Sequence, residues 1–368
     1  MIIDGHAYSF PPHSSAAGYP SVEEKMGLFQ RELGGHHQPV WRVRDRAPAD
    51  SSVLVDPDTS QLREIQWTHY PNRFTWTYEG ETYTKQYFPP MLHNLEFQPK
   101  LLIAEMDYAG VDMAILHTSP HLGMLNEFHA RAVASHPDRL MRLISLRDAE
   151  IPRDPDAAVR EVRGQVAAGG CCGFQFFPGF YYRGGHTEPW DDGAMRPFWE
   201  ALAELKIPLY ITLAGARRER RFSNAGREIY LEEHGILQRW MDRYPDVTVV
   251  ITHGLPWRTF LEGDRIKFPE ATWEVFDAPQ CHLQLLFPIQ MGGLWEYPWR
   301  EAEPTVKECV ERVGAHRLIW GTDMPMVARF CTYRQALDQY LVHCDFLSEG
   351  ERRDITGGTA ARVMGMGV

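Results

Sequence analysis

Three apolar segments that lie far apart in the chain end in side chains of the kind that bind metal ions. The first runs into His6, the second into His253 and the third into Asp323. Turn-forming residues follow each segment, which is the pattern of a short buried strand. The carboxyl ends of parallel strands meet at one face of a closed barrel, so we expect these side chains to form one metal-binding cluster. We also expect His253 and Asp323 to be catalytic.

Three further residues are candidates for the same cluster. Tyr8 lies two residues after His6 and faces the same side of a strand, where it is either a ligand or part of the pocket wall. Glu233 and His234 belong to a stripe of residues with helical spacing that should face the barrel. Burying both without a cation is costly, so we predict that they are ligands. The alternatives are that both are exposed, or that Glu232 replaces Glu233 on the inner face.

Other side chains are predicted to contact a substrate at the same face. His117 ends another apolar segment and is a candidate ligand or substrate contact, with His121 four residues later. The remaining substrate-binding candidates are aromatic: Trp76, Tyr83 and Trp257.

Apolar segments alternate with amphipathic helical patterns from about residue 100 onward, which predicts repeated strand–helix units and a parallel sheet. Eight strands favour a closed (β/α)8 TIM barrel over an open sheet. The strands are expected at 2–5, 113–116, 141–146, 173–177, 208–213, 247–252, 283–287 and 318–321. The helices are expected at 98–109, 125–135, 155–168, 195–205, 227–244, 306–313, 333–344 and 349–364.

The whole chain, 1–368, is expected to form one domain, since 368 residues with 44% hydrophobic content suit one barrel with insertions. Residues 9–97 are too long for an ordinary connection after the first strand. Within them, an aromatic-rich hairpin is predicted from strands at 74–78 and 81–88, joined by Glu79 and Gly80. We expect this insertion to be a lid over the barrel mouth or, equally, a subunit interface in a homo-oligomer.

Composition excludes several classes of protein. The net charge of −11 without a basic block argues against nucleic-acid binding. No run of about 18 apolar residues and no signal-peptide pattern is present, so we expect neither membrane spanning nor secretion. The 6 cysteines show no Cys-x-x-Cys spacing, which indicates reduced thiols in a cytoplasmic protein.

Taken together, these motifs resemble those of the amidohydrolase-related TIM barrels, the branch with decarboxylases and lactone hydrolases. The resemblance rests on the opening Ile-Asp-Gly-His, on Met106-Asp107 and Tyr244-Pro245-Asp246-Val247, on Thr252-His253-Gly254, and on Gly321-Thr322-Asp323-Met324-Pro325. Members usually begin with His-x-His and carry a metal-binding His on the fifth strand. This chain has Tyr8 and Thr212 at those two places.

A site rebuilt with carboxylate, imidazole and phenol groups suits iron. In this respect the chain resembles the TIM-barrel nonheme diiron monooxygenases of platensimycin-type diterpenoid biosynthesis. That resemblance implies two iron ions, O2 as co-substrate, an external electron donor or reductase, and hydroxylation of a bulky terpenoid or acyl substrate, CoA-linked or free, in secondary metabolism.

Two other functions stay open at this stage. The first is a decarboxylase or hydrolase that uses zinc or manganese, in which Asp323 carries a proton. The second is a degenerate barrel that binds a ligand or partner without catalysis, which the missing histidines at positions 8 and 212 would explain.

Overall fold

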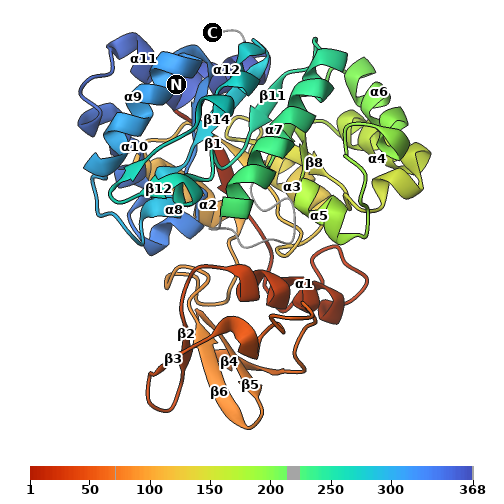
Figure 1. Cartoon of the computed structure of the whole chain (residues 1–368), viewed down its shortest axis with the longest axis vertical. Helices are drawn as coiled ribbons and strands as arrows, with labels where there is room; N and C mark the ends of the chain where they lie inside the picture. Colours follow the sequence, from red (N-terminus) through yellow and green to blue (C-terminus); the bar gives the residue numbers. More distant parts are fainter. Residues whose placement is uncertain (71, 214–223, 367–368) are drawn as a thin grey trace.

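The computed structural model of the chain describes residues 1–70, 72–213 and 224–366. Its main body is a nearly closed barrel of eight parallel strands with helices around it (Figure 1), so the expected TIM barrel is confirmed. The strands are β1 (Ile3–Tyr8), β7 (Met113–His117), β8 (Leu140–Ser145), β9 (Cys171–Phe176), β10 (Leu209–Ile211), β11 (Val249–Ile251), β14 (Cys281–Leu285) and β15 (Leu318–Trp320), paired in that order.

The helices around the barrel begin and end close to the predicted positions. They are α2 (Pro99–Ala109), α3 (Asn126–Ser135), α4 (Pro155–Ala167), α5 (Pro178–Arg183), α6 (Arg196–Glu204), α7 (Asn224–Arg243), α8 (Phe287–Met291), α9 (Glu303–Val313), α10 (Tyr333–Asp338), α11 (Glu349–Arg353) and α12 (Thr359–Val363). The short helices α5 and α8 were not predicted. The predicted helix 333–344 ends in a π-helical segment, Gln339–His343. The predicted helix 349–364 is interrupted by another, Asp354–Gly358, between α11 and α12. None of the described helices combines the length and the apolar character needed to cross a membrane.

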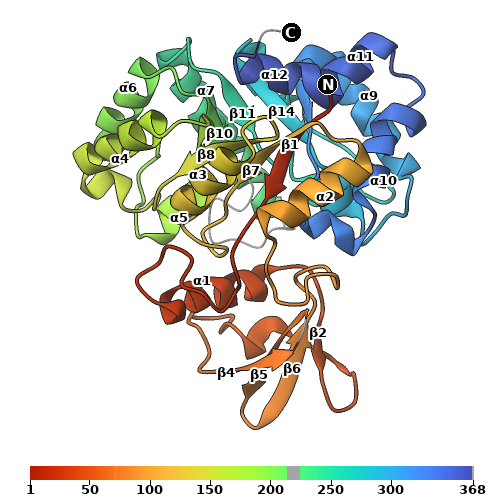
Figure 2. The same cartoon turned by 180° about the vertical axis from the view of Figure 1, so that it is seen from behind.

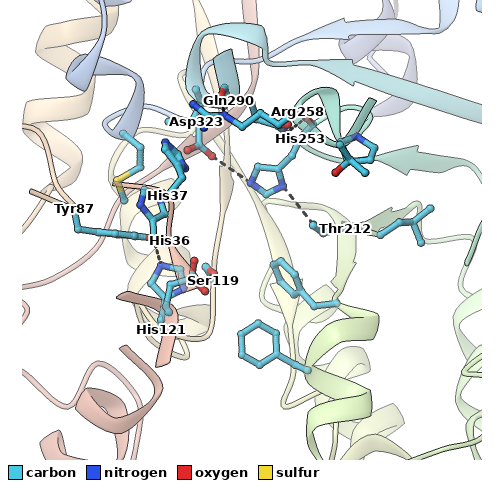
Figure 3. Close-up of a pocket in the computed structure, with 18 of the residues that line it drawn as sticks. His36, His37, Tyr87, Ser119, His121, Thr212, His253, Arg258, Gln290 and Asp323 are labelled. Carbon is cyan, nitrogen blue, oxygen red and sulfur yellow. Dashed lines mark hydrogen bonds and ion pairs between the residues drawn. The ribbon is translucent and has the colours of Figure 1, made fainter. Parts of the chain in front are cut away.

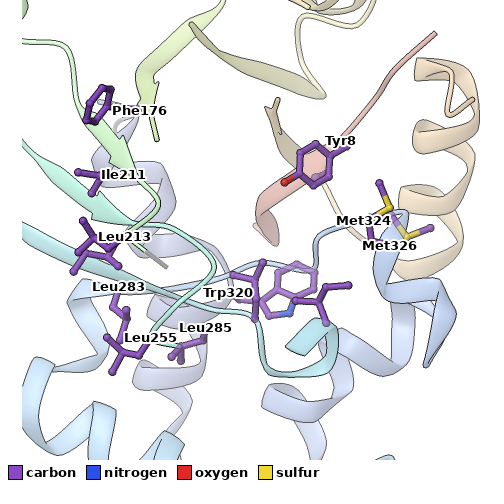
Figure 4. Close-up of a cluster of buried hydrophobic side chains, with 14 of the residues drawn as sticks. Tyr8, Phe176, Ile211, Leu213, Leu255, Leu283, Leu285, Trp320, Met324 and Met326 are labelled. Atoms are coloured by element: carbon purple, nitrogen blue, oxygen red, sulfur yellow. The ribbon is translucent and has the colours of Figure 1, made fainter. Parts of the chain in front are cut away.

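Strand side chains alternate between two apolar cores. A small core inside the barrel, near the beginnings of the strands, includes Ile3, Tyr210 and Ile319, and α12 contributes Ala360 to it. A larger core includes the alternate strand residues, among them Ile211, Leu283 and Leu285 (Figure 4), together with residues of the helices. The apolar filling of the lower barrel leaves the polar inner positions at the carboxyl ends of the strands.

The end of β1 joins the loop that follows β15 and brings the first and last strands together. Ala7 and Met324 form a parallel bridge, and the backbone N–H of Tyr8 donates to the Met324 carbonyl at 2.7 Å. The Asp323 N–H donates to the His6 carbonyl at 2.8 Å. His6 and Asp323 therefore become neighbours although they lie near opposite ends of the chain.

The insertion after β1 projects from one end of the barrel (Figure 1). It consists of α1 (Val22–Gly35) and a five-stranded antiparallel sheet in the order β3-β2-β6-β5-β4. These strands are β2 (Val40–Arg42), β3 (Pro48–Ala49), β4 (Gln66–Tyr70), β5 (Arg73–Tyr78) and β6 (Glu81–Lys85). The predicted hairpin is present as β5 and β6, and the left-handed conformations of Glu79 and Gly80 suit its two-residue turn. Viewed from behind, α1 lies between the barrel and this sheet (Figure 2).

Candidate metal centre and its cavity

Three side chains converge where β1, β11 and β15 end. Asp323 Oδ1 lies 3.4 Å from His6 Nε2 and 3.3 Å from His253 Nε2. One potential ligand atom from each of the three residues lies within 4.8 Å of the others. Two ligands that are each about 2.1 Å from a tetrahedral ion are separated by about 3.4 Å. The donor set and its spacing thus fit a single transition-metal ion.

The backbone at two of these residues has an unusual conformation. His253 has a φ of 60° and Asp323 a φ of 65°, in the left-handed region that few residues other than glycine adopt. Such strain concentrates at functional sites, where the surrounding structure enforces it. Here it turns each side chain out of the strand direction and toward the same point.

Gln284, on β14, fixes the orientation and tautomer of His6. The Gln284 amide Nε2 donates to the Gly5 carbonyl at 2.7 Å, which leaves Oε1 as the acceptor facing His6. His6 Nδ1–H donates to that oxygen at 2.8 Å, and the His253 backbone N–H donates to it at 3.2 Å. Because the proton is on Nδ1, the lone pair of His6 Nε2 faces Asp323 and is available for a metal ion. Sequence reasoning missed Gln284, whose signal is a polar residue between Leu283 and Leu285 in an apolar strand.

Tyr8 joins the same cluster from β1. Its hydroxyl lies 3.0 Å from His6 Nε2 and 3.3 Å from His253 Nε2. Burial raises the pKa of the Tyr8 phenol well above its ordinary value, and the nearby Asp323 carboxylate adds to the effect. Tyr8 is therefore a neutral phenol here, placed to ligate an ion or to donate a hydrogen bond to a bound group.

Electrostatics keep the carboxylate ionised and the imidazole neutral. Burial acts to raise the pKa of Asp323, but the hydrogen bond from His253 and the electrostatic interactions with the His253 and His6 rings outweigh it, so this pKa lies below its ordinary value. Burial lowers the pKa of His6 well below its ordinary value, with further lowering from His117 and His253. A carboxylate with a neutral imidazole is the protonation state that binds a cation.

Asp4 supports the cluster from below. This fully buried carboxylate accepts hydrogen bonds from the backbone N–H groups of His6 at 2.9 Å and Thr322 at 3.0 Å. It also accepts from the hydroxyls of Thr322 at 2.5 Å and Tyr333 at 2.7 Å. Burial raises the Asp4 pKa to about 6 against the effect of these donors. The aspartate of the opening Ile-Asp-Gly-His thus ties β1 to the loop that carries Asp323.

His117, predicted as a ligand or substrate contact, supports His6 instead. Its ring stacks on the His6 ring with centroids 3.6 Å apart, and its Nε2–H donates to the Gly5 carbonyl at 2.9 Å. It is fully buried and does not line the cavity described next. His117 therefore packs against the ring of His6 and does not face the cavity.

A cavity of about 230 Å³ opens beside the cluster (Figure 3). Tyr8, His253 and Asp323 line it from the barrel side. The insertion contributes Glu32, His36, His37 and Tyr87 to its wall. A second and larger cavity shares Glu32, Phe180 and Arg183 with the first one and extends between α1 and the barrel. The cavity beside the metal centre is therefore built jointly by the barrel and the insertion.

His121 lies in this cavity, where a substrate contact was predicted. Its Nδ1 lies 2.9 Å from the Ser119 hydroxyl and its Nε2 lies 2.7 Å from the Tyr87 hydroxyl. Figure 3 shows Ser119 and His121 close together on one side of the cavity, and His253 between Asp323 and Thr212 on the other. The Ser119–His121–Tyr87 chain links the barrel to the insertion.

Glu233 and His234, predicted as ligands, are not in the cluster that the described residues form. Both are buried and Glu232 is exposed, so the stripe on α7 faces the barrel as the spacing predicts. It packs against the outside of the barrel, however, where Glu233 accepts a hydrogen bond from Trp190 Nε1 at 2.8 Å. His234 packs against Tyr230 at 4.4 Å between ring centroids, and burial lowers its pKa to about 3.

The three aromatic residues predicted to contact a substrate lie elsewhere. Trp76 and Tyr83 pack against each other across β5 and β6, with ring centroids 6.2 Å apart. Trp257 is fully buried and stacks on Phe287 at 4.2 Å. None of the three lines the cavity, because each ring stabilises the local core of its own segment.

Comparisons with known proteins agree with this fold. The chain superposes on three solved structures at TM-scores just above 0.5. An uncharacterized TIM-barrel protein from Bordetella bronchiseptica is 17% identical, with 99% of this chain and 98% of that chain covered and a TM-score of 0.57. A probable 2-pyrone-4,6-dicarboxylic acid hydrolase from Acinetobacter baumannii, with citric acid bound, is 16% identical (74% and 91% covered, TM-score 0.56). A dihydroxybenzoic acid decarboxylase from a Polaromonas species, with manganese and an inhibitor bound, is 19% identical (74% and 87% covered, TM-score 0.51).

The family assignment rests on sequence. A search of curated proteins gave no match. The family model described as amidohydrolase matches residues 36–366, which is most of the chain and includes two of the three converging side chains. The chain therefore belongs to the amidohydrolase family.

Proposed function

We propose that this protein is a metal-dependent decarboxylase or hydrolase that acts on a small carboxylic acid. The observation that carries the proposal is the convergence of His6, His253 and Asp323 on one position at the wall of a cavity. Similar folds are found in a decarboxylase with bound manganese and in a probable hydrolase of a dicarboxylic acid. We infer one divalent ion per chain, manganese or zinc, held by these three residues and by Tyr8.

Each residue of the cluster has a distinct task in this proposal. His6 and His253 hold the ion through Nε2, and Gln284 keeps His6 in the required tautomer. When bound, the ion polarises a carboxylate or carbonyl group, or lowers the pKa of a bound water. Asp323 lines the cavity and carries a proton to or from the substrate on its carboxylate. The insertion excludes bulk water from the reacting groups.

The observations favour this function over the diiron monooxygenase that the sequence resemblance implies. A second ion needs a second group of donors, and within the described ranges the donor cluster consists of His6, His253 and Asp323. Glu233 and His234 pack outside the barrel. An intact donor cluster likewise argues against a degenerate, non-catalytic barrel.

The test is turnover without oxygen. The protein is loaded with manganese or zinc and incubated under argon with aromatic carboxylic acids and with lactones, while carbon dioxide release and ring opening are followed. We expect turnover with about one metal equivalent per chain, and loss of both metal and activity in His253→Ala. Glu233→Gln serves as the control that keeps both. Two irons per chain with strictly oxygen-dependent product formation would refute the proposal.

A further inference from the structure

Arg329 is a cation of the cavity wall that forms no ion pair with any acid among the described residues. It follows Asp323 by six residues and lines the same cavity. Its guanidinium lies over the rings of Tyr87, at 5.7 Å, and Phe330, at 5.5 Å. Nη1 donates to the Tyr87 backbone carbonyl, whereas the buried Nε has no hydrogen-bond partner. Within the part of the chain that the structure describes, no carboxylate lies within 4.0 Å of this guanidinium.

Such an arrangement is costly unless something else supplies the negative charge. Burial lowers the pKa of Arg329, yet an arginine stays protonated in proteins. Tyr87 and Asp323 are the groups whose charges counteract this lowering. The Asp323 carboxylate already faces His6 and His253, and in the proposed function it also faces a metal ion. Among the described residues, the Arg329 guanidinium therefore faces the cavity without a carboxylate in ion-pair contact.

The charged residues of the cavity wall also favour the binding of an anion. Among the described lining residues, Arg183, Arg258 and Arg329 stand against two acids, Glu32 and Asp323. A divalent ion would add two further positive charges. The cavity is then strongly positive in a chain whose net charge is −11, and a positive cleft of low dielectric attracts anions.

We propose that Arg329 binds a second carboxylate of the substrate, separate from the acid group at the metal centre, so that the preferred substrates are small planar dicarboxylates. This inference rests on the proposed function. The bond from Nη1 to the Tyr87 carbonyl fixes the plane of the guanidinium. Nε has no hydrogen-bond partner among the described residues, so we assign to Nε and Nη2 the two parallel hydrogen bonds to one carboxylate. Because Tyr87 belongs to the insertion, the insertion positions the group that selects the substrate.

Binding of two matched probes tests the inference. Isophthalate and benzoate differ by one carboxylate, and their affinities for the manganese-loaded full-length protein are measured by titration calorimetry. We expect isophthalate to bind about 10- to 100-fold more tightly than benzoate, as charge-assisted hydrogen bonds allow. Arg329→Gln should abolish this preference and leave the benzoate affinity within about twofold of wild type. Arg329→Lys keeps the charge without the planar edge and should retain only part of the preference.

The control is Arg312→Gln, at a surface arginine that binds Glu270 through two hydrogen bonds of 2.7 Å. It should leave both affinities unchanged. Manganese content and the circular dichroism spectrum show whether each variant is folded, and Arg329→Lys carries the test if Arg329→Gln is not. Equal wild-type affinities for the two probes, or an equal loss of both in the Arg329 variants, would overturn the inference.

The binding and turnover experiments together distinguish failure of the dicarboxylate site from failure of the proposed function. If the loaded protein neither releases carbon dioxide nor opens lactones, yet binds isophthalate in an Arg329-dependent way, the dicarboxylate site stands and the proposed function fails. If it decarboxylates or hydrolyses monocarboxylates and shows no preference for isophthalate, the proposed function stands and the dicarboxylate site fails.

Discussion

Gln284→Leu should weaken metal binding by about 10- to 100-fold, the usual effect of removing a group that orients a ligand. Leucine has a similar size but accepts no hydrogen bond. The substitution leaves the buried Nδ1–H of His6 and the backbone N–H of His253 without their acceptor. It also removes the donor to the Gly5 carbonyl. Free rotation of His6 and loss of the required tautomer then reduce the population of rings that can bind an ion.

The free energy of unfolding should change as well. Three hydrogen bonds are lost at a fully buried position, and each contributes about 0.5–1.5 kcal/mol to stability. We therefore expect the metal-free variant to be about 2–4 kcal/mol less stable than the metal-free wild type. Urea denaturation of the metal-free protein measures this change, and competition with a chelator measures manganese and zinc affinity.

Gln339→Leu is the matched control for this experiment. Gln339 is also a buried glutamine, but within the described ranges neither of its amide atoms has a hydrogen-bond partner. Its replacement should leave metal affinity unchanged and keep or raise stability. Gln284→Glu should restore much of the metal affinity, because a carboxylate again accepts from His6. If Gln284→Leu folds and binds metal as tightly as wild type, the tautomer argument is wrong.

Three further predictions concern separate parts of the molecule. Gly321→Ala should reduce metal affinity on the order of tenfold, measured by chelator competition, because the added Cβ would lie 2.8 Å from His6 Cβ and displace that ring. Glu233→Gln should leave metal content and chelator-measured affinity unchanged, since its amide oxygen can still accept from Trp190; loss of metal would restore Glu233 as a ligand. His129 is protonated below about pH 6.5 in the unfolded chain, but burial lowers its pKa to about 4 in the folded one. The free energy of unfolding should thus fall as the pH drops from about 6.5 to about 4. Urea denaturation should show that this fall is about 3 kcal/mol smaller in His129→Gln than in wild type, and an unchanged pH dependence in the variant would contradict the prediction.

The helix stripe on α7 shows where sequence reasoning ends. Its spacing of three and four residues correctly predicts that Glu233 is buried and Glu232 exposed. Periodicity identifies the buried face of a helix but not the element against which that face packs. One partner of Glu233 is Trp190, on a loop 43 residues earlier in the chain, and this contact exists only once β9, α6 and α7 have packed together.

The sequence by itself determined the barrel and the convergence of His6, His253 and Asp323. His6 lies in the second half of β1, and His253 and Asp323 follow β11 and β15 within three residues. Parallel strands in one barrel bring their carboxyl ends to a common face. Only the tertiary structure decided which other side chains reach that face. Gln284 orients His6, the insertion supplies Tyr87, and Arg329 faces the cavity, because these contacts join segments whose separation along the chain carries no local signal. Hydrophobic periodicity encodes burial, whereas the partner of a buried polar group depends on how distant elements meet.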